Sequence, residues 1–183
     1  MGTWEEVDEG FIFNLVSIDG VHCAIEEPRP FSTKNSSHKL GGSAGVNYEL
    51  GIKIHRPQLV WVYGPTAPGK DNDLEVFRQS LKHHLPVGTK IIADDGYIGE
   101  PDYISVNNEF DPPFIAEFKR RLKSRHETFN QRLKCYKYLP TKFRHGRDKH
   151  KYSFHAICAI TQYQIDNGST SLFDPCPADL LRE

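Results

Sequence analysis

The first half of the chain alternates short apolar runs with polar breaks, a pattern typical of β-strands. FIFNLVSID predicts a strand that stops at Asp19 and Gly20, and VHCAIEE predicts a second strand entered through a tight turn. A polar loop over 28–45 follows, and then VNYELGIKI and QLVWVYG predict two more strands. The pattern favours a three-stranded meander at the start of the fold.

The pattern changes to helical spacing after residue 73. Leu74, Phe77, Leu81 and Leu85 predict a helix that Asp71 or Asn72 would cap. KIIA and YISV then predict two short buried strands. A long helix is expected from near Phe114, with one apolar side made by Ile115, Phe118, Leu122, Phe129, Leu133 and Tyr136. The segment HKYSFHAICAITQYQI is apolar on most sides and predicts a buried last helix that ends at Asn167 and Gly168.

This order of elements predicts one α/β domain over 11–168, with a mixed sheet flanked by helices. The segments 1–10 and 169–183 are expected to be short, loose termini. Apolar runs such as QLVWVYG are too short to span a bilayer, and the acidic start does not fit a secretion signal. The four cysteines are far apart in the sequence and lack the spacing of a zinc finger, so we expect neither disulfides nor zinc.

The charge is unevenly distributed, although the formal net charge is only -1. From Lys119 to Lys151 the chain carries thirteen Lys or Arg and two acids, so this tract has a charge of +11. A helix exposed to water is seldom so one-sided, and aromatic residues are interspersed through the tract. This favours an anionic partner such as nucleic acid.

Three acidic residues stand where metal chemistry is plausible. Asp19 and Asp94 each follow a predicted strand, and ligands gather beyond the carboxyl ends of parallel strands. Glu127 falls roughly 150° from the apolar side of the long helix, together with basic residues. Carboxylates without thiols are hard oxygen ligands suited to Mg²⁺ or Mn²⁺. Alternatively, the aspartates are turn residues and Glu127 pairs with a nearby lysine.

Four segments in this order resemble the catalytic domain of Harbinger-type DDE transposases and the nucleases derived from them. They are SIDGVHCAI, PGKDNDLEVFR, IIADDGYIGE and SRHETFNQRLKCY. The resemblance covers about residues 11–168 and implies a ribonuclease H-like fold. It implies a divalent-metal-dependent DNA endonuclease or transposase domain in the nucleus, with two ions of Mg²⁺ or Mn²⁺ in its site.

The resemblance assigns catalytic roles to Asp19, Asp94 and Glu127, which would also bind the metal. It adds Asp73 as a further metal ligand, whereas Asp95 reads as a turn residue. Within the basic tract, the residues expected to contact DNA are Arg120, Lys123, Arg125, Arg132 and Lys134. The chain departs from the family pattern where it has Asn72 instead of a histidine and Gln131 instead of a glycine.

Other interpretations remain open at this point. Too few residues precede the first strand for a helix-turn-helix, which leaves three alternatives: a fragment, a diverged descendant, or a catalytic subunit that relies on a separate DNA-binding protein. The chain could instead be a catalytically silent nucleic-acid-binding protein that keeps the fold. It could also be a related enzyme that cuts RNA or hybrid duplexes.

Overall fold

The computed structural model describes residues 14–28, 30 and 32–168. The expected loose termini, 1–10 and 169–183, lie outside this part of the chain, as does Cys176. The described strands are β1 (Asn14–Ala24), β2 (Gly45–Lys53), β3 (Leu59–Thr66), β4 (Lys90–Ile92) and β5 (Ile104–Ser105). They form one sheet in the order β3-β2-β1-β4-β5.

The sheet is mixed, as the sequence predicts. β1, β2 and β3 pair antiparallel, whereas β4 is parallel to β1 and β5 is parallel to β4. β1 is therefore the central strand: it pairs with β2 from Val16 to Ala24 and with β4 at Asn14 and Ser17. The meander over the first three strands and the two short strands after residue 89 are confirmed.

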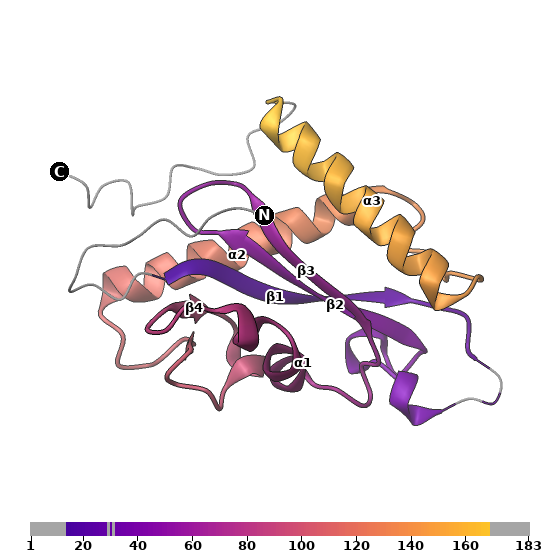
Figure 1. Ribbon diagram of the computed structural model, residues 1–183, viewed down its shortest axis with the longest axis horizontal. Helices are drawn as coiled ribbons and strands as arrows, with labels where there is room; N and C mark the ends of the chain where they lie inside the picture. The colour runs from indigo at the N-terminus through magenta and orange to yellow at the C-terminus, as the bar shows by residue number, and fades with distance from the viewer. Residues whose placement is uncertain (1–13, 29, 31, 169–183) are drawn as a thin grey trace.

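Three α-helices cover the two faces of the sheet: α1 (Asp73–Gln79), α2 (Pro113–Cys135) and α3 (Arg147–Asp166). Figure 1 shows α2 and α3 on one side of the strands and α1 on the other. The expected α/β fold with a mixed sheet and flanking helices is confirmed. Among the described residues, no helix is both long and apolar enough to pass through a membrane.

Alternate residues of β1 contribute to two cores. Val21 and Cys23 pack with Phe129 and Leu133 of α2, and Val16 and Ile18 pack with residues of the α1 side. Side chains of a strand point alternately to the two faces of the sheet, so one strand can supply both cores. The apolar side predicted for α2 is the buried one, whereas Glu127 is exposed on the opposite side.

The predicted turn at Asp19 and Gly20 is wrong. β1 runs through both residues, and they pair with Leu50 and Glu49 of β2 in continuous register. An Asp-Gly pair favours a turn locally, but the antiparallel pairing with β2 keeps the chain extended here. Asp19 therefore lies in the middle of a strand and not at its end.

The expectation that the last helix is apolar and buried on most sides is also corrected. α3 buries one side, which includes Phe154 and Cys158, against the sheet and α2. On the other side, Tyr152 is 75 % exposed and Tyr163 is 68 % exposed. α3 therefore has one buried side and one exposed side, although many residues on the exposed side are apolar.

The helix predicted from Leu74 to Leu85, and its cap, agree with the structure in part. Asn72 caps α1, because its side-chain oxygen accepts a hydrogen bond from the Glu75 amide at 2.8 Å. The helical spacing then continues beyond α1 in a short 3-10 helix, Leu81–His84. The polar loop over 28–45 contains two further 3-10 helices, Thr33–Asn35 and His38–Leu40.

Candidate functional site

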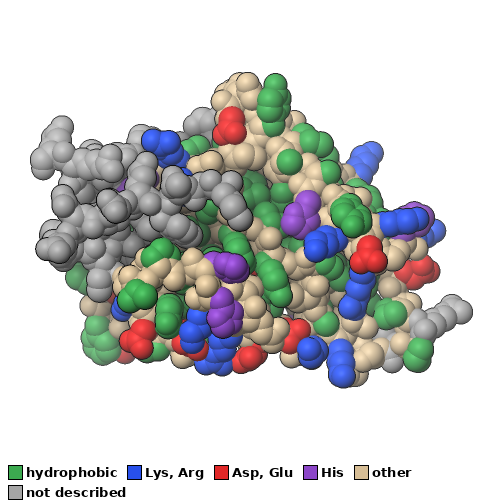
Figure 2. Space-filling view, viewed as in Figure 1, with side chains coloured by type: hydrophobic (Ala, Val, Ile, Leu, Met, Phe, Trp, Pro, Cys, Tyr) green, Lys and Arg blue, Asp and Glu red, His purple; other side chains and the backbone are tan. Residues whose placement is uncertain are grey.

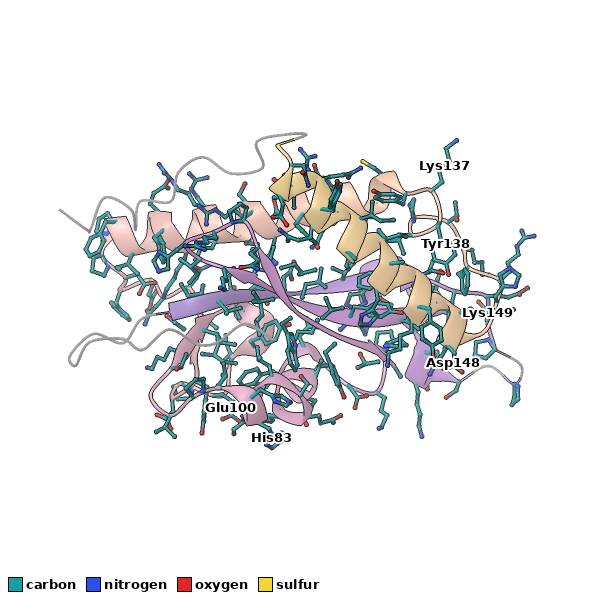
Figure 3. The ribbon with its side chains drawn as sticks, turned by 45° about the horizontal axis from the view of Figure 1, so that its top comes forward. His83, Glu100, Lys137, Tyr138, Asp148 and Lys149 are labelled. Atoms are coloured by element: carbon teal, nitrogen blue, oxygen red, sulfur yellow. The ribbon has the colours of Figure 1, made fainter. Side chains whose placement is uncertain are left out.

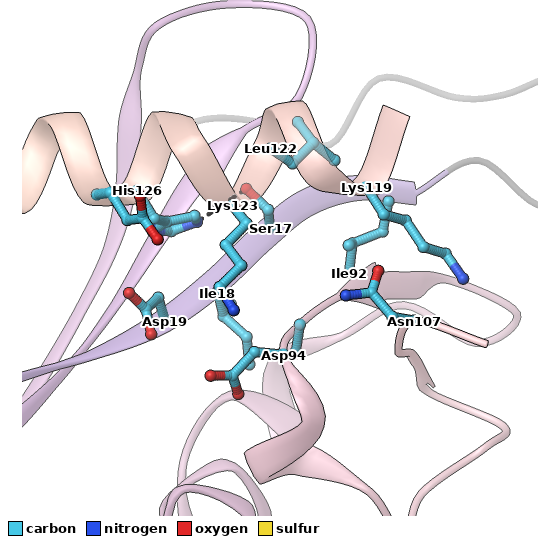
Figure 4. A pocket seen from close by; sticks show the side chains of 12 residues that line it. Ser17, Ile18, Asp19, Ile92, Asp94, Asn107, Lys119, Leu122, Lys123 and His126 are labelled. Atoms are coloured by element: carbon cyan, nitrogen blue, oxygen red, sulfur yellow. Dashed lines mark hydrogen bonds between the residues drawn. The ribbon is translucent and has the colours of Figure 1, made fainter. Parts of the chain in front are cut away.

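One pocket lies between the centre of the sheet and α2. Asp19 of β1, Asp94 after β4 and Glu127 of α2 all line it, together with Lys123 and His126. Figure 4 shows Asp19 and Asp94 at the pocket, with Lys123 extending from α2 toward them. The three residues predicted to be catalytic are therefore brought to one pocket from three separate elements.

Asp19 is held by two hydrogen bonds. Its Oδ1 accepts the backbone N–H of Gly20 at 2.7 Å, and its Oδ2 accepts the side-chain amide of Asn130 at 3.0 Å. Burial, with smaller contributions from Asp94 and Asp73, raises the pKa of Asp19 to about 6, against the attraction of Lys39 and the hydrogen bond from Gly20. A carboxylate so crowded by other acids is stabilised in its charged form by a bound cation.

Asp94 follows the end of β4, as the sequence predicts. It caps the 3-10 helix Asp95–Tyr97, where its Oδ1 accepts the Gly96 amide at 3.0 Å. Asp95 is exposed within that turn, which agrees with its interpretation as a turn residue. The two adjacent aspartates therefore have different surroundings: Asp94 lines the pocket, and Asp95 does not.

Glu127 projects from the exposed side of α2 at the rim of the pocket. Among the described residues, no three carboxylate, His or Cys side chains are gathered closely enough to share one ion as they stand. The oxygen donors fit Mg²⁺ or Mn²⁺, which accept carboxylates and keep positions open for water and phosphate.

Asp73 lies on the other side of β1. A Cβ atom added to Gly20 would be 2.9 Å from Asp73 Oδ1, and one added to Gly96 would be 3.2 Å from Asp73 Oδ2. The absence of side chains at these two glycines makes room for the carboxylate. Asp73 is therefore near the site, but it does not line the pocket of Asp19 and Glu127.

His126 joins the floor of the pocket to the sheet. Its Nε2 is 2.9 Å from Ser17 Oγ, and both side chains are buried. Burial lowers the pKa of His126 to about 4, so the ring is neutral at pH 7. Because Ser17 precedes Asp19 by two residues and His126 precedes Glu127 by one, this contact joins β1 to α2 close to the two acids.

The five residues expected to contact DNA fall into two groups on α2. Arg120, Lys123 and Lys134 share the side of Glu127, while Arg125 and Arg132 lie roughly 150° away around the helix. Arg125 donates a hydrogen bond to the Ile54 carbonyl at 2.6 Å, which is a structural contact. Arg120 forms two 2.7 Å contacts with Glu117. Lys123 is the member of the set that lines the pocket.

The basic tract continues beyond α2. Lys137 and Lys149 project outward near the connection between α2 and α3 (Figure 3). The face shown in Figure 2 carries basic and acidic side chains together, so it is not uniformly positive. The tract therefore extends along α2 and its connection to α3, next to the candidate site.

Sequence reasoning missed Lys39, Asn47, His126 and Asn130. Asn130 stands three residues after Glu127, and this helical spacing places it on a neighbouring side of α2. Lys39 and Asn47 contact Asp73 from a loop and from β2, and no local pattern indicates either contact.

No protein-family model, curated protein or solved structure matches this chain.

Proposed function

We propose that the chain is the catalytic domain of a divalent-metal-dependent DNA endonuclease or transposase with a ribonuclease H-like fold. The observation that carries this proposal is the convergence of Asp19, Asp94 and Glu127 on one pocket beside a basic tract. The strand order β3-β2-β1-β4-β5, with antiparallel pairing first and parallel pairing after, supports the fold.

In this proposal the three carboxylates would hold Mg²⁺ or Mn²⁺ at the pocket. Such an ion lowers the pKa of water and stabilises the charge that develops on a phosphodiester. Lys123 contacts the phosphate from α2, and the rest of the basic side of α2 positions the DNA backbone without reading its bases. His126 stays neutral and keeps α2 against β1.

Sequence specificity is proposed to come from a separate DNA-binding protein, because phosphate contacts alone do not distinguish bases. The resemblance to Harbinger-type transposases further suggests a role in the nucleus. Strand joining by the freed 3'-hydroxyl is part of the same proposal.

A plasmid-nicking assay with Mg²⁺ or Mn²⁺ tests the proposal by comparing the same substitution at two neighbouring positions. Asp94→Asn is expected to abolish nicking while it keeps DNA affinity, because it removes a metal ligand and a negative charge. Asp95→Asn makes the same chemical change in the neighbouring turn residue and is expected to nick normally. Equal nicking by wild type and Asp94→Asn would remove Asp94 from the mechanism.

The same assay separates the alternatives. If the wild type nicks no substrate and Mg²⁺ does not stabilise it, but DNA binding remains salt-dependent, the chain is a silent nucleic-acid-binding protein. Faster cleavage of RNA or of a hybrid duplex than of DNA would instead indicate a ribonuclease.

A further inference from the structure

The four acids predicted as metal ligands are divided by β1. Asp19 points toward α2, where Asn130 binds it, whereas Asp73 lies against Gly20 on the side of α1. Asp94 borders both groups: a Cβ atom at Gly96 would be 3.1 Å from Asp94 Oδ1 and 3.2 Å from Asp73 Oδ2. The four acids thus divide into one position at the pocket and a second position around Asp73.

The position around Asp73 already contains a cation from the protein. Lys39 Nζ lies 3.3 Å from Asp73 Oδ2, and the Asn47 amide donates to Asp73 Oδ1 at 3.1 Å. Both oxygens of Asp73 therefore have a donor. The field of Lys39 extends further, because it is the attractive charge acting on the buried Asp19.

The turn that presents Lys39 is built into the fold. Lys39 belongs to the 3-10 helix His38–Leu40, which Ser37 precedes. Ser37 is fully buried, and its hydroxyl is 2.7 Å from Nδ1 of His22 in β1. After the turn, Leu40 packs so closely on Gly45 that a Cβ there would be 2.7 Å from its Cδ1. The backbone of the turn is therefore fixed on both sides of Lys39, whose side chain reaches Asp73 and is itself 47 % exposed.

Electrostatics keeps this lysine charged. Burial lowers the pKa of Lys39, but Asp73 and Asp19 outweigh that effect and raise it above the ordinary value, with a smaller contribution from Asp94. Two divalent ions together with this ammonium would carry more positive charge than the four carboxylates balance. One ion and the ammonium would not.

We propose that Lys39 occupies the second cation position of the cluster, so that the protein binds one divalent ion, through Asp19, Asp94 and Glu127. This inference rests on the proposed function and replaces the expected pair of ions. Asn47 marks the same position, because its Oδ1 is buried without a hydrogen-bond partner in the described structure. It lies 3.3 Å from the place where Gly20 would carry a Cβ. If Lys39 is removed, the oxygens of Asp73 and Asn47 can receive an ion.

Counting bound Mn²⁺ by isothermal titration calorimetry and by electron paramagnetic resonance tests this inference on the full chain. The wild type is expected to bind one ion, and Lys39→Met is expected to bind a second. Lys39→Arg keeps the charge and is expected to bind one. Lys70→Met is the matched control, because Lys70 pairs with Asp71 and not with the cluster.

The two aspartates give a second comparison that does not depend on Lys39 variants. Asp73→Asn is expected to change the affinity for the single ion less than threefold, whereas Asp94→Asn lowers it about tenfold or more. Circular dichroism and thermal unfolding with and without Mn²⁺ verify that each variant is folded.

Two ions in the wild type, or one ion in folded Lys39→Met, would overturn the assignment of Lys39 while leaving the proposed nuclease intact. An equal loss of affinity in Asp73→Asn and Asp94→Asn would also overturn it. Failure of the proposed function has a different result, since the wild type would then bind no ion at all.

Discussion

The side-chain amide of Asn130 donates a hydrogen bond to Asp19 Oδ2 at 3.0 Å, joining α2 to the central strand. Glu127 stands one helical turn before Asn130. The residue that orients Asp19 and the acid Glu127 therefore belong to the same helix. Together with the contact between Ser17 and His126, this bond sets the position of α2 along β1. The pocket therefore depends on polar contacts as well as on the apolar core.

Loss of this amide is expected to weaken metal binding. Asn130→Ala leaves Asp19 Oδ2 without its donor, and removal of a residue that orients a ligand typically lowers metal affinity by about tenfold to 100-fold. Gln131→Ala, at the exposed neighbouring position, is the control and should bind Mn²⁺ as the wild type does. Mn²⁺ titration measures both, and equal affinities would show that Asn130 does not orient Asp19.

Gly20→Ala is expected to destabilise the protein by about 2 kcal/mol, because the new methyl group would meet Asp73 Oδ1 at 2.9 Å. Urea unfolding measures the effect. In an Asp73→Ala background the same substitution should cost much less, since the atom that it meets has been removed. A similar cost in both backgrounds would place the clash elsewhere.

Glu49 gives the protein a dependence on pH. The carboxyl group is fully buried in β2, and burial raises its pKa from 4.5 to about 7, against hydrogen bonds from Trp61 and Ser80. Between these values the unfolded chain loses the proton that the folded protein keeps. The contribution of Glu49 to stability is therefore present below pH 4.5 and is lost as the pH rises through 7.

Glu49→Gln keeps the shape of the side chain and removes its ionisation. At pH 8 the variant is expected to be more stable than the wild type by about 2 kcal/mol, and near pH 4.5 the two should be similar. Chemical unfolding across this range measures the difference. A difference that stays constant with pH would show that Glu49 is ionised in the folded protein.

Two basic residues two positions apart on α2 should behave differently. Lys123→Gln removes a charge at the pocket and is expected to reduce the salt dependence of DNA binding by about one unit of slope. Arg125→Gln removes the hydrogen bond to the Ile54 carbonyl and is expected to lower stability by about 1 to 2 kcal/mol with little change in that slope. Fluorescence anisotropy over a range of salt concentrations, with urea unfolding, measures both. Equal slopes for Lys123→Gln and wild type would exclude Lys123 from the DNA contact.

Periodicity predicted most of the elements because they obey local rules. The apolar spacing of α2 and the cap of α1 by Asn72 depend on residues within a few turns of each other. β1 was wrongly divided because Asp19 and Gly20 resemble a turn in isolation. Their extended conformation depends on pairing with β2, which comes some thirty residues later in the chain.

The site was predictable in part for the same reason. Asp94 follows a short apolar strand, and Glu127 stands out by its angle on a helix, so both can be selected from the sequence. The contacts of Asp73 with Lys39 and Asn47 join a helix, a loop and a strand, and no spacing in the sequence encodes them.

The location of Asp19 in the middle of β1 affects how the protein can fluctuate. The backbone amides of β1 that are hydrogen-bonded to β2 on either side of Asp19 are exposed only when these two strands separate. Their hydrogen exchange with solvent should consequently be among the slowest in the molecule, close to the rate set by global unfolding. Larger motions are then left to the exposed loops around this central strand.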